Sequence, residues 1–255
     1  MTVELRWSLD PSVGVGVLAL AAAYAWLGRG RLDRARRAVW LGAGLATVWL
    51  ALESPLDALA DDVLLSAHMA QHVLLGMVAP ALMLLGLSPA MAAWLARRMP
   101  GLRALTEPMP AMMIMPTVMI AWHAPVLYGM ALESEQLHVV QHLTLIGGGL
   151  LFWWPVMEAT AAQSFQRLGP RGRLGYLLMM TVPVGGIGLT LLLAPQPVYA
   201  FYRAAPRLAG WWTPLADQRL AGGLLLTLGE GIIVLAAARL RLRGLARRPA
   251  PVRSA

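Results

Sequence analysis

The chain has 255 residues, of which 58% are hydrophobic and only 13% charged. Soluble domains carry about 25% charged residues, so this composition excludes an ordinary water-soluble protein and predicts an all-α membrane protein. The absence of cysteine excludes disulfides and thiolate metal ligands. The net charge of +8 comes from arginine alone, and its clusters suit lipid headgroups rather than nucleic acid.

Apolar runs of about 20 residues predict transmembrane helices, and the chain contains seven such runs. In chain order they lie at about 11–27, 38–52, 63–87, 108–127, 137–156, 174–193 and 220–238. We expect them to form one seven-helix membrane domain over residues 1–240. A basic cytoplasmic tail at 241–255 follows, and its prolines argue against an ordered structure there.

The arginines predict the orientation of this domain. When the connections between the runs are assigned alternately to two sides, most of the arginines fall on one side, in the segments 29–37, 97–103, 167–173 and 239–253. Positively charged residues favour the cytoplasmic side. The amino terminus is therefore expected outside and the carboxyl terminus inside, in a multi-pass protein of a bacterial plasma (inner) membrane.

Four of the five histidines occur in two copies of one motif. His68–His72 and His138–His142 both read H-x-x-Q-H, and each motif lies near the outer start of a predicted helix. Histidines four residues apart project from the same helix face. The fifth, His123, lies near the outer end of the fourth predicted helix. Because imidazoles inside a membrane are costly and usually functional, their common depth predicts a metal site.

Several neighbouring side chains are candidate auxiliary groups. Gln71 and Gln141, inside the two motifs, either orient the imidazoles or bond between helices. If a helix begins near Asp57, then Asp61 shares a stripe with the first histidine pair and could attract cations. The alternative is that Ser54 and the acidic residues after it cap this helix.

Methionines and one acidic residue complete the candidates. Met112, Met115 and Met119 share a helix face with His123, and thioethers with imidazoles suit cuprous copper. Methionine is also a common filler of apolar packing. Glu230 lies deep in the last predicted helix, where a carboxyl group is a functional candidate, although its flanking glycines are equally explained by close helix packing.

The combined motifs resemble those of the CtaG-type cytochrome c oxidase assembly factors of the caa-oxidase kind. The resemblance covers about residues 11–238, and only the stretch after Gly222, Leu224 to Thr227, departs from the pattern. The segments that carry it are Ser54–Asp57, Ser66–His72, Trp122–Tyr128, His138–His142, Phe152–Pro155 and Asp217–Gly222. It implies a membrane protein that helps to mature heme-copper oxidase, by handling copper for its metal centres.

The resemblance, joined to the histidine pattern, implies a non-enzymatic assembly factor. We expect the five histidines to bind copper, as Cu(I), in the outer third of the bilayer and to hand it to the oxidase. The alternatives are a heme-binding protein and a membrane zinc hydrolase that uses the same histidines. The expected partners are oxidase subunits, membrane lipid and an extracytoplasmic copper donor; a homo-oligomer is compatible with the sequence. The outer segment 195–219, rich in proline and aromatic residues, is either a docking surface or a lid.

Overall fold

The computed structural model describes residues 5–28, 34–163 and 167–246, and the regular elements in these ranges are all helices. In chain order they are α1 Pro11–Leu27, α2 Arg34–Glu53, α3 Pro55–Asp62, α4 Leu65–Val73, the π-helix η1 Leu74–Val78, α5 Ala79–Gly86, α6 Pro89–Arg98, α7 Pro100–Leu105, α8 Pro108–His123, α9 Pro125–Glu133, α10 Glu135–Trp153, α11 Glu158–Ala161, α12 Pro170–Met179, α13 Thr181–Leu193, α14 Ala200–Ala204, α15 Pro214–Leu224, the π-helix η2 Leu225–Gly229 and α16 Glu230–Ala246.

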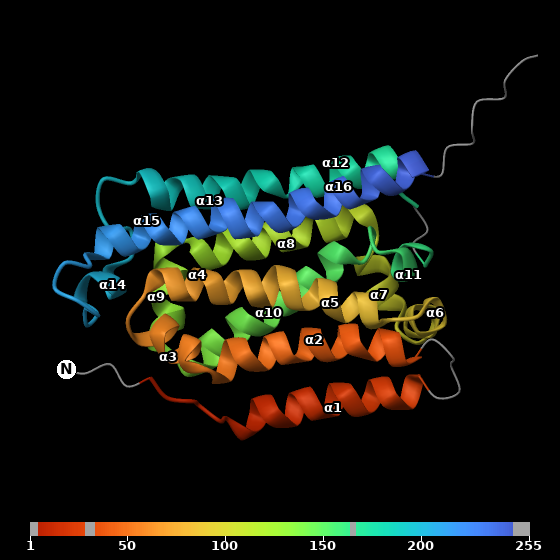
Figure 1. Ribbon diagram of the computed structural model, residues 1–255, viewed down its shortest axis with the longest axis horizontal. Coiled ribbons are helices and arrows are strands. Elements are labelled where there is room, and N and C mark those ends of the chain that lie inside the picture. The colour runs from red at the N-terminus through yellow and green to blue at the C-terminus, as the bar shows by residue number, and fades with distance from the viewer. Residues whose placement is uncertain (1–4, 29–33, 164–166, 247–255) are drawn as a thin grey trace, which may run out of the picture.

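The long helices lie side by side along the long axis of one bundle (Figure 1). The short helices α3, α9 and α14 gather at one end, and α6, α7 and α11 gather at the other. The helix α1 lies at the edge of the bundle beside α2, while α4, α8 and α10 run through its middle. The two ends of the bundle therefore differ in their covering elements.

Local sequence signals decide where many of these helices begin. A proline stands in the first turn, preceded by a short polar side chain that accepts a backbone N–H bond. This arrangement satisfies a donor that the helix itself leaves free. The capping side chains of this kind are Asp10 for α1, Ser54 for α3, Ser88 for α6 and Thr213 for α15.

Three helical stretches are long and apolar enough to cross a membrane: Leu65–Gly86, Pro170–Leu193 and Pro214–Leu242. Counting each of two bent helix pairs as one span raises the number to five. The structure thus confirms an all-helical protein with helices of membrane-spanning character in the part of the chain it describes. Seven spans, and their orientation, stay predictions.

One predicted run is interrupted. The run 108–127 is divided after His123, where α8 and α9 meet at 74°. The cause is Pro125, because the residue before a proline avoids the helical region, and Ala124 is extended with ψ of 126°. The stripe of Asp57 and Asp61 with the first histidine pair depended on one continuous helix, and that condition is not met, since α3 ends at Asp62 and α4 begins only at Leu65.

The interior is apolar, and so is much of the outer surface. One buried cluster joins α4, α8, α10, α13, α15 and α16, and a smaller one joins α1, α2 and α5. Large apolar side chains also point outward from the long helices, among them Leu18, Val182 and Leu235, which are 68–72% exposed. Exposed apolar side chains on helix after helix fit a lipid environment. At the carboxyl end α16 continues to Ala246, into the segment expected as a tail, and 247–255 lie outside the described residues.

Candidate metal centre

Three helices bring the five histidines together at the end of the bundle that α3, α9 and α14 cover. The pair His68 and His72 lies on α4, the pair His138 and His142 on α10, and His123 is the last residue of α8. Their ring centroids are 4.3 Å apart within each pair. The structure therefore places all the histidines of the chain in one group.

Rings on different helices also lie in contact range of one another, at longer distances than within a pair. The centroids of His68 and His138 are 5.4 Å apart with the rings stacked. Those of His72 and His142 are 6.1 Å apart, and His72 lies 5.4 Å from His123. His68 and His72 are at most 1% exposed. Buried imidazoles in mutual contact are an unusual arrangement, because burial favours apolar neighbours or complete hydrogen bonding.

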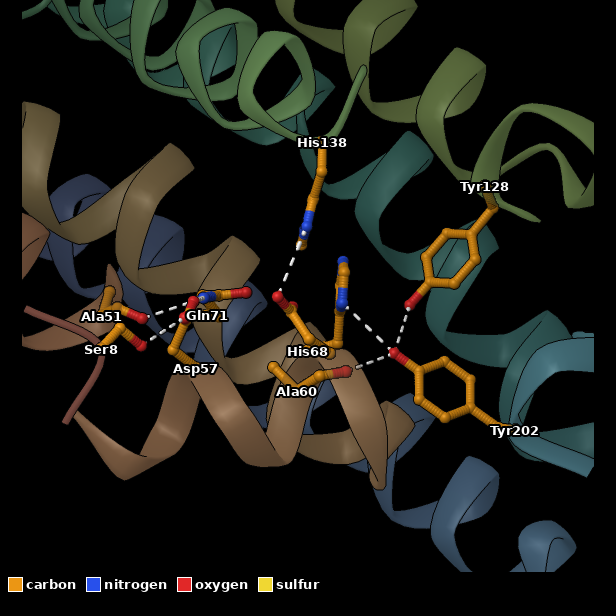
Figure 2. A network of polar contacts seen from close by, with 10 residues as sticks. Ser8, Ala51, Asp57, Ala60, His68, Gln71, Tyr128, His138 and Tyr202 are labelled. Atoms are coloured by element: carbon orange, nitrogen blue, oxygen red, sulfur yellow. Dashed lines mark hydrogen bonds and ion pairs between the residues drawn. The ribbon is translucent and has the colours of Figure 1, made fainter. Parts of the chain in front are cut away.

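The tautomer of His68 follows from its contact with Tyr202. The Tyr202 hydroxyl donates to the carbonyl oxygen of Ala60 at 2.6 Å, and its oxygen lies 3.2 Å from His68 Nδ1 (Figure 2). Burial raises the pKa of Tyr202 well above its usual value, so the hydroxyl keeps its proton. Because that single proton is donated to Ala60, Nδ1–H of His68 must be the donor to Tyr202, and Nε2 carries the free lone pair.

A second histidine, His123, is oriented through the same nitrogen. His123 Nδ1 lies 2.7 Å from the carbonyl oxygen of Met119, which can only accept a hydrogen bond. Metal-bound histidines usually donate their second ring N–H to a carbonyl or carboxylate in this way. Nε2 is then the nitrogen left for a ligand. His138 Nδ1 lies 3.6 Å from the Asp61 carboxylate, which is too long for a hydrogen bond, so for His123 alone of these two the tautomer follows from the contact.

The Nε2 atoms of His68, His72, His138 and His142 are buried and have no hydrogen-bond partner among the described residues. For His72, both ring nitrogens are buried and without a hydrogen-bond partner among these residues. Unsatisfied buried polar groups are rare, and each calls for a ligand or another explanation. Ligand atoms of Asp61, His68 and His138 also lie within 4.8 Å of one another, close enough to hold a metal ion together.

Two tyrosines of the segment 195–219 contact this group, and the role of the segment as a docking surface or a lid stays a prediction. Tyr202 of α14 reaches His68, and Tyr128 of α9 donates to the Tyr202 hydroxyl at 3.3 Å (Figure 2). The Tyr199 hydroxyl donates to the carbonyl oxygen of His123 at 2.9 Å. Burial also raises the pKa of Tyr199, so it too remains a neutral donor. Asp61 is the most open member of the group, with 35% of its side chain exposed.

The glutamines of the two histidine motifs, Gln71 and Gln141, differ in their hydrogen bonding. Gln71 Nε2 donates to the carbonyl oxygen of Ala51 at 2.9 Å and to Asp57 at 2.8 Å (Figure 2). It therefore joins α4 to α2 and α3 and does not orient an imidazole. Gln141 is fully buried, and its amide has no partner in the described part of the chain.

The methionines named from the sequence lie mainly in the apolar core. Met115 and Met119 are at most 4% exposed, and Met112 packs against the same cluster. Met115 fills the space beside Gly76 and Gly148. Packing explains the burial of this stripe, and a role for it in copper binding stays a prediction. The carboxyl group of Glu230 lies against Gly185 of α13 and not among the histidines.

Three residues that contact or position the histidines were not identified from the sequence: Met69, Tyr202 and Asp217. Met69 Sδ lies 3.3 Å from His123 Nε2, and its position three residues before His72 was the available signal. Tyr202 is far from the motifs in sequence, and only the aromatic content of its segment hinted at a role. Asp217 accepts hydrogen bonds from the backbone N–H groups of Leu65 and Ser66, and so caps α4 from α15.

The fold and the histidine group together describe an all-helical protein of membrane type with a candidate metal centre at one end. A family model, the cytochrome c oxidase caa3 assembly factor (Caa3_CtaG), matches residues 16–246. The chain belongs to this family of oxidase assembly factors. No curated protein and no solved structure matches it.

Proposed function

We propose that this protein binds copper as Cu(I) through His68, His72, His123, His138 and His142, and passes it to a heme-copper oxidase subunit during assembly. The supporting observation is that the Nε2 atoms of four of these histidines are buried and have no partner among the described residues. One of these four rings, that of His68, already engages its Nδ1 in a contact with Tyr202. Imidazole nitrogen suits copper, and thioether sulfur favours the cuprous ion. Transfer would proceed by exchange of ligands, without covalent chemistry.

The membrane arrangement belongs to the same proposal. In a bacterial inner membrane with seven spans and the amino terminus outside, the histidine group would lie near the outer face. An extracytoplasmic copper donor and the oxidase subunit would both reach it from that side. The cytoplasmic end would carry the arginine clusters, which favour anionic lipid.

The two alternative ligands are less well supported. The ring contacts of 4.3–6.1 Å between neighbouring histidines favour a small ion, because a porphyrin would have to separate them. Zinc suits a group of imidazoles with one carboxylate such as Asp61. Zinc bound in place of copper would favour the hydrolase alternative.

Copper binding by the purified protein is the direct test. The protein is loaded with Cu(I) without oxygen and its bound metal is measured. The double variant His72→Ala/His142→Ala should bind clearly less copper than the wild type, while Gln136→Ala, exposed on the same α10, should bind as much. Unchanged copper in the double variant would contradict the proposal, and a Soret absorption band would favour heme. In cells, loss of the gene should lower oxidase activity, with partial rescue by added copper.

A further inference from the structure

The histidine group contains two sets of ligands that differ in exposure and in donor type. The outer set is Asp61, His68 and His138, whose ligand atoms lie within 4.8 Å of one another. The side chains of this set differ in solvent exposure: Asp61 is 35% exposed, His138 is 13% exposed and His68 is fully buried. Its donors are one carboxylate oxygen and two imidazole nitrogens.

The inner set is Met69, His72 and His123. All three are buried, with at most 7% of each residue exposed. The ring of His72 lies 5.4 Å from that of His123, and neither of its nitrogens has a partner among the described residues. Its donors are two imidazoles and one thioether sulfur, the combination that favours a cuprous ion.

The contact between His123 and Met69 points specifically to a cation. His123 donates its Nδ1 proton to Met119, so in the neutral ring Nε2 presents a lone pair. The Met69 sulfur 3.3 Å away has no proton either and can only accept. Two electron-rich atoms that face each other in a buried site gain little from their contact. A shared cation between them would convert that contact into two bonds.

We propose that the histidine group holds two copper positions, an outer exchange position formed by Asp61, His68 and His138 and an inner position formed by Met69, His72 and His123. This inference rests on the proposed copper function. It adds to that function a route for the ion, from the outer to the inner position, and a selectivity of the inner position for the cuprous ion. His142, whose ring lies 4.3 Å from that of His138 and 6.1 Å from that of His72, is placed to contact an ion moving between the two positions. The ion stays Cu(I) throughout, so the movement is ligand exchange only.

The test combines copper stoichiometry with X-ray absorption on the Cu(I)-loaded, full-length protein. The wild type should bind two ions per chain and show a copper–sulfur scattering shell. Met69→Leu keeps the side-chain volume but should lose that shell and bind one ion. Asp61→Asn should also bind one ion, yet keep the copper–sulfur shell, because the inner set is intact.

Two matched variants serve as controls. Met91→Leu changes a buried methionine of the smaller apolar cluster, away from the histidines, and Asp62→Asn changes the exposed neighbour of Asp61; both should behave as the wild type. A copper–sulfur shell that survives Met69→Leu, or a single ion in the wild type, would overturn the two-position inference while leaving copper binding in place. Absence of copper from the wild type would instead refute the proposed function itself.

Discussion

At the scale of single residues, the candidate centre depends on which ring nitrogen each histidine presents. Neutral imidazole has one donor and one acceptor nitrogen, and the group bonded to Nδ1 decides which is which. The hydroxyl oxygen of Tyr202 accepts a hydrogen bond from Nδ1–H of His68, and the carbonyl oxygen of Met119 accepts one from Nδ1–H of His123. The Nε2 atoms of both histidines therefore carry the free lone pairs. These outer contacts orient the rings before any ion is bound.

Removing the Tyr202 hydroxyl should therefore weaken copper binding. In Tyr202→Phe, His68 loses the acceptor of its Nδ1 proton and the tautomer is no longer held. Loss of such an outer partner typically lowers metal affinity about 10–100-fold. The affinity is measured by competition with a Cu(I) chelator.

Tyr176→Phe is the control for that variant, because its buried hydroxyl donates to the carbonyl oxygen of Phe152, away from the histidines. Tyr176→Phe removes this one bond, whereas Tyr202→Phe removes the contacts of its hydroxyl with Ala60, His68 and Tyr128, so the thermal stability of Tyr202→Phe should fall further. Equal copper affinities in the two variants would show that Tyr202 only supports the fold.

At the scale of elements, the helix ends and one irregular helix position the histidines. The break before Leu65 lets α4 start beside α15, where Asp217 satisfies its first N–H groups. The turn at Pro125 ends α8 directly after His123. Immediately beyond His72, α4 passes into the π-helix η1, whose Met77 carbonyl accepts a bond from Trp153 of α10. Irregular π turns occur frequently beside functional sites.

The contact between η1 and α10 requires glycine. A Cβ atom on Gly149 would overlap the carbonyl oxygen of Gly76 and approach Pro80 Cγ to 2.7 Å. Gly149→Ala should therefore force the two helices apart and destabilise the protein by about 1–3 kcal/mol. Thermal unfolding in detergent measures this change.

Gly147 provides the comparison, because a Cβ atom there meets nothing within 4 Å. Gly147→Ala should keep the wild-type unfolding temperature, and since alanine favours helices it should do no harm. If the two alanine variants unfolded at the same temperature, the close approach of α10 and η1 would not be a source of stability.

At the scale of the whole molecule, charge is distributed unequally between the two ends of the bundle. The arginines of α6, α7 and α12 lie at the end opposite to α3, α9 and α14 (Figure 1). The acidic residues Asp57, Asp61 and Asp62 lie on α3, at the histidine end. This polarity agrees with the predicted orientation, in which the arginine-rich end is cytoplasmic.

Cysteine labelling tests that orientation cleanly, because the natural chain has no cysteine. Trp211→Cys places a thiol on the exposed segment before α15, and Arg98→Cys places one at the end of α6. In intact cells a membrane-impermeant maleimide should label the first and spare the second. After the membrane is opened, both should react. Labelling of Arg98→Cys alone in intact cells would reverse the orientation.

The sequence alone determined the helical membrane class, the family and the five histidines, because hydrophobicity, helix spacing and short motifs are local properties. For Gln71 it gave two alternative roles, and one of them, a hydrogen bond between helices, is the role that the structure shows. Only the tertiary structure decided which rings meet, that Asp61 lies beside His138, and that Met69 faces His123. Tyr202 lies more than a hundred residues from His68, and Asp217 more than a hundred residues from Leu65, and no local pattern specifies such contacts. They exist because packing the apolar faces of the helices brings distant polar side chains to one end of the bundle, where burial makes each of them need a partner.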